Sequence, residues 1–201
     1  EPYHPSHDDY QIKGDCRRWI ARSLNLGTRA RLLKESDVEQ AFKEAELGKP
    51  VLLAFNHHDF RDMRPDVIQV QDMIKKVSKK FSDINFCFCE ARDGMRRALD
   101  LEEKSPINFE IKIDNNKLKV ATNKPTFGSQ PFLAIKTNDG RFFHDNFDFQ
   151  KPFYRWSYVF DNITFPISAI ETVGIGTCDS VGNVTVVTIN PKTGDFSQVQ
   201  F

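Results

Sequence analysis

Several ionisable side chains follow directly after an apolar run in the middle of the chain. The run covers residues 51–55, and it is followed by Asn56, His57, His58, Asp59 and Arg61. Histidine can carry a proton at neutral pH, a carboxylate can orient it, and arginine can bind an anionic or carbonyl oxygen. Adjacent residues on an extended chain point to opposite faces, so one of the two histidines can enter a site while the other packs. We expect a proton-transfer site here, and prefer His58 as the proton carrier.

The same residues have a simpler alternative explanation. A polar turn between a strand and a helix commonly carries an acidic residue that caps the helix, and Asp59 or Asp62 is placed for that role. We favour the functional interpretation because the polar group directly follows a strand that we expect to be buried.

A second group of candidates lies near the beginning of the sequence. Residues 1–15 contain two prolines and two histidines without hydrophobic periodicity, which predicts an ordered loop. His4, His7, Asp8 and Asp9 have the donor atoms of a metal site, but a site usually collects its ligands from separate elements. We therefore assign no metal ligand here, and expect Tyr3, His4 and His7 to contact the substrate.

The elements that must position these residues alternate between helix and strand. We expect a helix at 16–26, and another from Ser36, with a Ser36–Glu39 capping box, to Gly48. A strand at 51–56, a helix from Pro65, a strand at 84–89 and a short helix follow. This order predicts parallel strands, whose C-terminal ends carry the ligand sites of α/β folds. Because so few strands are present, we expect residues 1–105 to be part of a larger α/β domain whose earlier strands are missing or come from another chain.

From residue 106 the pattern changes to an alternation with a period of two. Short β-strands are separated by turn sequences such as Asp114-Asn115-Asn116 and Gly182-Asn183. This predicts an immunoglobulin- or fibronectin-like β-sandwich at 106–201, behind an α/β domain at 1–105. The aromatic residues of this part, at 142–149 and at Tyr154, Trp156 and Tyr158, either stack on sugar rings or form the core.

Composition and charge exclude some classes of function. Lys+Arg and Asp+Glu are both 28, so the net charge is +0, which argues against binding nucleic acid through phosphate contacts. No apolar run reaches the roughly 20 residues of a transmembrane helix. Cys87 and Cys89 are expected to be buried thiols, and unpaired cysteines slightly favour a cytoplasmic location without assigning one. The lysines between 75 and 80 are expected to form a solvated helix face.

Residues 1–105 resemble the C-terminal half of the polysaccharide deacetylase superfamily. The resemblance rests on the loop Pro2-Tyr3-His4-Pro5, the strand that runs into His57 and His58, and a later strand that ends at Glu90-Ala91. Residues 53–58 resemble the family's last catalytic motif, a Leu-x-His strand end. The resemblance implies a distorted (β/α) barrel that removes acyl groups from sugars with a metal-activated water, and His58 as the general acid.

The sequence departs from the family in its metal site. The Asp pair and the His-x-x-x-His motif of the family are absent, and the spacing of His4 and His7 is three rather than four. A divalent metal, zinc in the first place, is therefore expected in a full-length parent, and the chain is expected to be an incomplete enzyme that acts on acylated carbohydrate. The alternative is a non-catalytic carbohydrate-binding or interaction module built on the β-sandwich.

Overall fold

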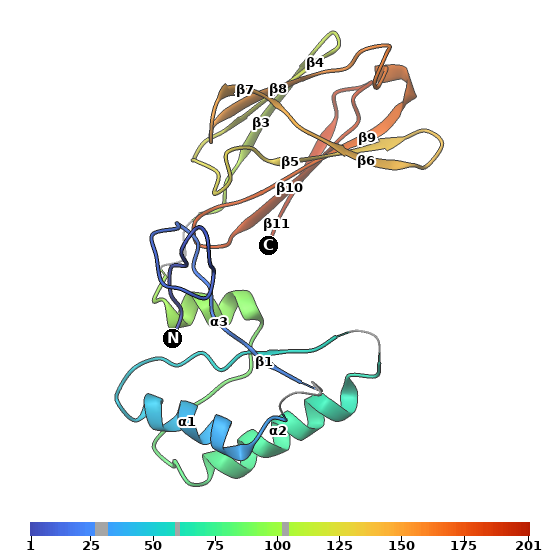
Figure 1. Ribbon diagram of the computed structural model, residues 1–201. Helices are drawn as coiled ribbons and strands as arrows, with labels where there is room; N and C mark the ends of the chain where they lie inside the picture. Colours follow the sequence, from blue (N-terminus) through green and yellow to red (C-terminus); the bar gives the residue numbers. More distant parts are fainter. Residues whose placement is uncertain (27–31, 59–60, 102–104) are drawn as a thin grey trace. The chain divides into compact units, whose positions relative to one another are not determined.

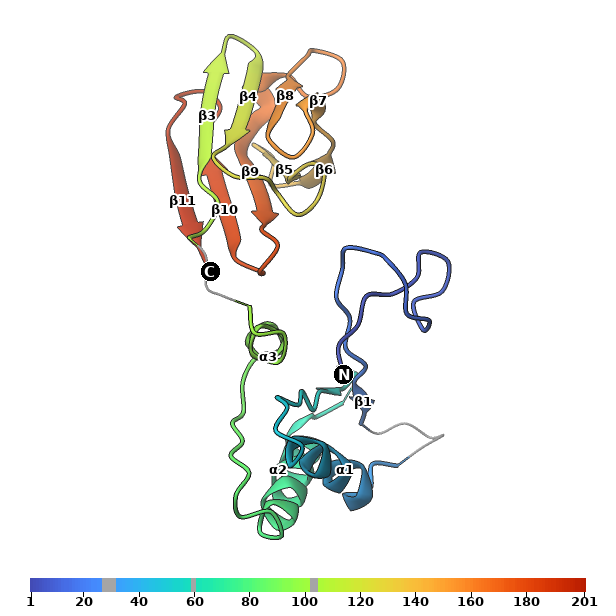
Figure 2. The ribbon, with the colours of Figure 1, turned by 90° about the vertical axis from the view of Figure 1, so that its left-hand side faces the viewer.

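The chain divides into two compact units, Glu1–Leu101 and Glu102–Phe201, which are described separately. The computed structural model describes residues 1–26, 32–58, 61–101 and 105–201 (Figures 1 and 2). The described residues form three β-sheets, one in the first unit and two in the second. None of the described helices is long and apolar enough to cross a membrane.

The first unit is built from three helices and one short pair of strands. Its elements are β1 (Leu24–Asn25), α1 (Glu35–Ala45), β2 (Phe55–Asn56), α2 (Arg64–Ser78) and α3 (Ala91–Ala98). β1 and β2 pair in parallel. Helices α1 and α2 lie side by side (Figures 1 and 2), because their apolar stripes share one core. The buried residues of this core are Val38, Phe42, Val70, Ile74 and Val77.

Two ion pairs join helices α1 and α2. Lys76 binds Glu35 and Lys80 binds Glu39, and each pair spans 41 residues of sequence. Equal spacing along both helices means that α1 and α2 run in the same direction, as expected for helices that alternate with parallel strands. The hydrogen bond and the charge of Lys80 lower the pKa of the Glu39 carboxyl. Two of the lysines that we expected on a solvated face thus connect the two helices.

Several predictions for this unit are wrong. Residues 16–26 form no helix, since Ile20 bridges to Tyr3 and residues 24–25 form strand β1. Helix α1 begins at Glu35 rather than Ser36, and its first turn is closed by Asp37, whose carboxylate accepts the Lys34 N–H at 3.0 Å. Pairing with β2 determines the structure of residues 24–25, and the Asp37 side chain determines where α1 begins. The hydrophobic pattern of the sequence predicts neither contact.

The predicted strand at 84–89 is the largest departure. These residues are assigned to no strand, Phe86 and Phe88 are partly exposed, and the Cys87 and Cys89 thiols are exposed rather than buried. Of the predicted strand 51–56, only Phe55 and Asn56 pair. The parallel pairing therefore stops at two strands in the described residues, and the partial barrel is not confirmed.

The second unit is a β-sandwich. Its strands are β3 (Phe109–Asp114), β4 (Lys117–Thr122), β5 (Phe132–Thr137), β6 (Phe142–Asp145), β7 (Asp148–Lys151), β8 (Arg155–Val159), β9 (Ile170–Cys178), β10 (Val184–Ile189) and β11 (Phe196–Gln200). They form a five-stranded sheet in the order β11-β10-β9-β5-β6 and a four-stranded sheet in the order β3-β4-β8-β7. The two sheets enclose one hydrophobic core, as the alternating pattern predicts.

The sequence predicted the turns of the sandwich more accurately than the number of its strands. Asn115, Gly140 and Gly182 adopt positive φ, as tight turns between antiparallel strands require. Strand β11 was not predicted, and the aromatic segment 142–149 is divided between β6 and β7 of different sheets. Trp156 and Tyr158 are buried in the core. These two side chains therefore offer no surface for stacking on a sugar ring.

Candidate functional site

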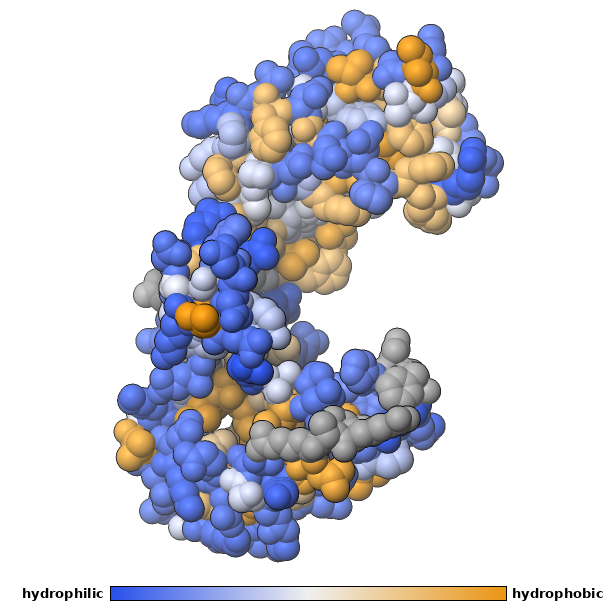
Figure 3. Space-filling view, viewed as in Figure 1, coloured by the Kyte–Doolittle hydropathy of each residue, from blue (hydrophilic) through white to orange (hydrophobic). Residues whose placement is uncertain are grey.

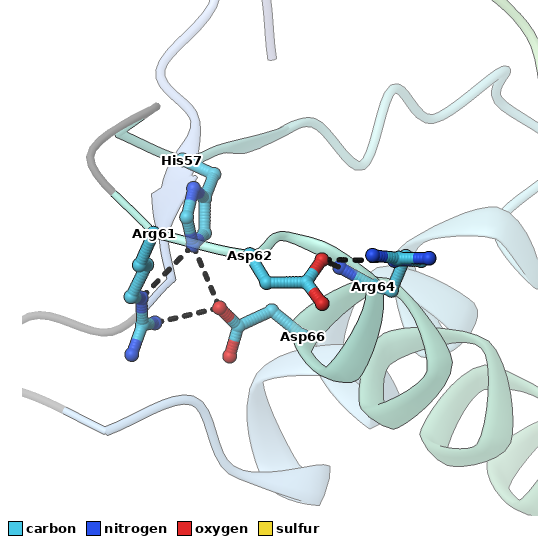
Figure 4. A network of polar contacts seen from close by, with 5 residues as sticks. All are labelled: His57, Arg61, Asp62, Arg64 and Asp66. Carbon is cyan, nitrogen blue, oxygen red and sulfur yellow. Dashed lines mark hydrogen bonds and ion pairs between the residues drawn. The ribbon is translucent and has the colours of Figure 1, made fainter.

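A cluster of three polar side chains lies where β2 ends and α2 begins (Figure 4). His57 follows β2 directly, and Asp66 lies in the first turn of α2. The His57 Nε2 atom is 2.7 Å from the Asp66 Oδ2 atom. Arg61 donates from Nη2 to the same carboxylate oxygen at 2.6 Å, and its Nε lies 3.1 Å from His57 Nε2.

The start of α2 explains why Asp66 reaches back to the strand end. Asp62 accepts hydrogen bonds from the Arg64 backbone N–H at 3.1 Å and from Arg64 Nε at 3.0 Å, which lowers the pKa of the Asp62 carboxyl. Pro65 fits the first turn because it has no N–H to leave unpaired. An acidic residue in that turn also interacts favourably with the helix dipole, so Asp66 is well placed there. Asp62 lies one residue before Met63, the N-cap of α2, so it supports the helix start through Arg64 without being the predicted cap.

The geometry selects one tautomer of His57. A single ring nitrogen cannot donate to Asp66 and accept from Arg61 at the same time. The contact with the carboxylate is the shorter one, and two lone pairs facing each other at 2.7 Å would repel. We therefore assign the proton to Nε2, with Asp66 as its acceptor. This leaves Nδ1 as the nitrogen that can accept or deliver a proton.

The second ring nitrogen of His57 is buried without a partner. The His57 side chain is only 7% exposed, and Nδ1 has no hydrogen-bond partner among the described residues. Buried polar atoms are almost always paired, so an unpaired one needs an explanation such as a bound water, local strain or a catalytic role. Asp66 on one side and an unpaired nitrogen on the other give His57 the arrangement of an oriented general acid or base.

The sequence pointed to this strand end, with His58 as the preferred proton carrier, and that role stays a prediction. His58 is exposed, Asp59 lies outside the described residues, and the Arg61 guanidinium binds Asp66. Asp66 itself was missed, although a carboxylate just after a helix-starting proline is a recognisable signal. Asn56 was noted without a partner; its side-chain oxygen accepts a hydrogen bond from Ser23 at 2.9 Å, which ties the chain before β1 to the strand end.

The N-terminal loop is ordered, as expected, by its own contacts. Tyr3 exchanges backbone hydrogen bonds with Ile20, and its hydroxyl donates to the Tyr10 carbonyl at 2.8 Å. The His4 ring packs against Trp19 at an interplanar angle of 39°, with ring centroids 3.7 Å apart. His7 contacts the neighbouring Asp8 at 3.0 Å and is exposed. The ring of His4 and the hydroxyl of Tyr3 thus hold the loop together, while the role of all three residues in substrate contact stays a prediction.

The described residues do not fit a metal centre. Across the described ranges, no three side chains of His, Cys, Asp or Glu come together in a way that could hold an ion. His4 and His7 each bind a different neighbour. The cluster of His57, Arg61 and Asp66 contains a single carboxylate, which Arg61 already binds.

A cavity of about 590 Å³ lies in the same unit, and none of His57, Arg61 and Asp66 lines it. It separates residues 50–55 from residues 84–91, and its walls come mainly from apolar side chains of α1, α2 and these two segments. Hydrophobic side chains reach the surface of this unit above the polar ones of α1 and α2 (Figure 3). The two segments that we expected to pair as neighbouring parallel strands are thus held apart by open apolar space.

Comparison of the chain with protein-family models, with curated proteins and with solved structures gives no match.

Proposed function

We propose that residues 1–101 belong to a hydrolase that resembles polysaccharide deacetylases and acts on acylated carbohydrate, with His57 as the group that delivers a proton to the leaving amine or alcohol. The observation that carries the proposal is the His57–Asp66 pair at the end of β2. It fixes one ring nitrogen against a carboxylate and leaves the other, buried and without a partner, for the reacting group.

The proposed role follows from how a buried carboxylate acts on an imidazole. When the ring is protonated, Asp66 stabilises the positive charge and holds the ring in one orientation, so that Nδ1–H is the donor. Once Nδ1–H has given up its proton, the neutral ring keeps its Nε2–H on Asp66. Arg61 binds the same oxygen of Asp66 and holds that carboxylate in place. His57 is thereby the proton carrier, and Asp66 and Arg61 are its positioning residues.

The arrangement of the first unit supports a barrel-like origin for this site. Strands β1 and β2 are parallel, each is followed by a helix, and α1 and α2 run in the same direction. We propose that this order is a section of a (β/α) barrel, with its missing N-terminal half as a partner, and that the second unit is an immunoglobulin- or fibronectin-like sandwich. A polar site at the C-terminal end of β2 is where such a fold carries its chemistry.

The test is the release of acetate from N-acetylated chitooligosaccharides by the full-length natural protein. His57→Gln should reduce the rate by about 10²- to 10⁴-fold, the usual contribution of a general acid. His58→Gln is the matched control, because it alters the next residue and should leave the rate within roughly twofold. Equal rates for wild type and His57→Gln, or a wild-type protein that releases no acetate, would contradict the proposal.

A second candidate function, sugar binding by the sandwich, is favoured by one observation. Phe132 and Phe142 are 61% and 74% exposed, and the Phe132 ring stacks on His144 with an interplanar angle of 14° and centroids 6.1 Å apart. Such a surface suits the C–H face of a sugar ring. Titration of chitooligosaccharides into the intact chain tests it: Phe132→Ala should weaken binding, whereas Phe149→Ala, in the other sheet, should not.

A further inference from the structure

The cavity of the first unit has the size of a small-molecule site and contains none of the residues of the polar cluster. Its volume is about 590 Å³, and its walls come mainly from helices α1, α2 and α3 and from residues 50–55 and 84–91. Ligand pockets commonly measure about 300–1,000 Å³ and combine apolar walls with a few polar groups. Because His57 and its partners lie outside these walls, a ligand here is independent of the proposed hydrolase.

Small side chains on two helices leave this space open. They lie three or four positions apart on α1 and on α3, so each set shares one helix face, and they are Ala41, Ala45, Ala91, Gly94 and Ala98. A Cβ atom at Gly94 would lie 2.7 Å from the Leu52 Cδ1 atom and 3.3 Å from the Cys89 Sγ atom. Helix α3 therefore contacts both flanking segments at its glycine without filling the space between them.

Aromatic side chains in the cavity wall are open to solvent. Phe86 and Phe88 are 45% and 57% exposed, and their rings meet edge to face with centroids 5.7 Å apart. Phe86 also contacts the ring of the buried Phe42, at a centroid distance of 5.9 Å. The apolar surface thus continues from the core of the unit to the outside. Exposed apolar surface of this kind is typical of a binding site.

One positive charge in the wall has no carboxylate partner among the described residues. The Arg97 Nη1 atom donates to the Cys87 Sγ atom at 3.2 Å, and a thiol is only a weak acceptor. The other charged residues of the wall, Lys49 and Glu90, have oppositely charged partners at 3.8 and 3.9 Å. A guanidinium presents five N–H groups in a planar fork that matches a carboxylate. The wall therefore suits a ligand with a single negative charge.

The two flanking segments give the cavity room for a long ligand. Residues 50–55 and 84–89 contain no helical turn and run as long traces in Figures 1 and 2. Six residues of extended chain span at most roughly 20 Å. Half of a bilayer's hydrocarbon core, about 15 Å, is the thickness that one layer of lipid acyl chains occupies. The segments are therefore long enough to accompany an acyl chain over its whole length.

We propose that the cavity binds a free fatty acid of roughly 12–16 carbons, with its carboxylate on Arg97 and its chain along the apolar walls. A fatty acid matches both features of the wall, because it has one negative charge and a long chain without further polar groups. The guanidinium donates two parallel hydrogen bonds to the carboxylate, and the chain removes Phe86 and Phe88 from water. A peptide would instead place its amide groups against these apolar side chains, which is unfavourable.

Isothermal titration calorimetry of the intact chain with fatty acids of increasing length tests the proposal. Decanoate, dodecanoate and tetradecanoate should each bind at one site. Each addition of two methylene groups should raise the affinity roughly tenfold, because every buried methylene contributes about three- to fourfold. Dodecanol has the same chain without the charge, and it should bind at least about tenfold more weakly than dodecanoate.

Substitutions separate the contribution of the charge from that of the chain. Arg97→Gln should lower the affinity for dodecanoate to that for dodecanol and leave the affinity for dodecanol unchanged. Arg96→Gln is the matched control, because Arg96 is the preceding residue of α3 and does not line the cavity, so this variant should bind like wild type. Ala45→Leu places a larger side chain in the cavity and should weaken the binding of both ligands.

Three results would each overturn the proposal. They are a wild type that binds no fatty acid, an affinity that does not rise with chain length, and dodecanol that binds as tightly as dodecanoate, which would indicate an uncharged ligand. These measurements use wild type alone, so they decide the proposal even if a variant loses its fold. An Arg97→Gln variant that folds, as judged by ellipticity at 222 nm, and still prefers dodecanoate to dodecanol would also contradict it.

Discussion

Replacing Asp66 with asparagine should destabilise the first unit of the chain and leave the second unchanged. The substitution keeps the shape of the side chain but removes the charge that two groups share. The nearly buried His57 ring loses a charged acceptor at 2.7 Å, which costs about 1–3 kcal/mol for a group that cannot turn to water. The half-exposed Arg61 adds at most about 1 kcal/mol, because solvent screens its contact. We expect a total loss of ~2 kcal/mol.

The two units can be followed separately in one urea titration. The described α-helices α1, α2 and α3 belong to the first unit, so the ellipticity at 222 nm follows its unfolding. Trp156 is buried in the sandwich core, so its emission follows the second unit once Trp19 is replaced with Phe. A loss of ~2 kcal/mol and a slope of about 2 kcal/mol per M urea predict a midpoint lower by about 1 M.

Asp62→Asn is the matched control for this experiment. Asp62 lies four residues earlier at the same helix start, but its partner Arg64 is almost fully exposed and asparagine still accepts the backbone N–H. We expect a change within about 0.5 kcal/mol. The reasoning would be refuted if Asp66→Asn cost no more than Asp62→Asn, or if it shifted the Trp156 transition by the same amount as the helical one.

Three further predictions concern local packing and pH. Gly14→Ala should disrupt the N-terminal loop, because a Cβ there would lie 2.5 Å from the Ser6 Cα, and a changed Trp19 emission would report it. Burial raises the pKa of Tyr158 above its ordinary 10.0, so the sandwich should lose stability as the pH rises beyond 10, and Tyr158→Phe should remove that loss in urea titrations followed by Trp156 emission. The pKa of the Glu39 carboxyl is lowered from its ordinary value of 4.5, so this group stabilises the first unit at pH values above 4.5. That stabilisation is lost as the pH falls below 4.5. Glu39→Gln should therefore flatten the acid side of the stability profile measured by ellipticity.

The parts of the fold that the sequence predicted are those whose signal is local and repeated. Helix α2 was predicted because Pro65 marks its start and apolar residues recur every three or four positions up to Val77. The sandwich was predicted because alternation and turn residues recur over many strands. The segment 16–26 was mispredicted because eleven residues satisfy a helical pattern by chance, while the pairing of Leu24 with Phe55, 31 residues away, decides its structure.

The candidate site shows the same limit. We predicted a site here from the apolar run that precedes His57 and His58. Two adjacent residues point to opposite sides, however, and which side is interior depends on elements elsewhere in the chain. Asp66 lies nine residues after His57 and in a different element. Only the direction in which α2 leaves the strand end brings the carboxylate to the ring. No spacing rule within the sequence contains that information.

The ion pairs between α1 and α2 also determine how far one helix can slide along the other. Glu35 and Glu39 are one turn apart, as are Lys76 and Lys80, so a shift of one turn, roughly 5 Å, could leave one pair intact. In one direction, however, that shift would set Glu35 against Asp72 and Lys43 against Lys80, placing like charges together twice. In the other direction a single pair, Glu35 with Lys80, would remain. The charge order along the two helices therefore selects a single alignment of α1 with α2.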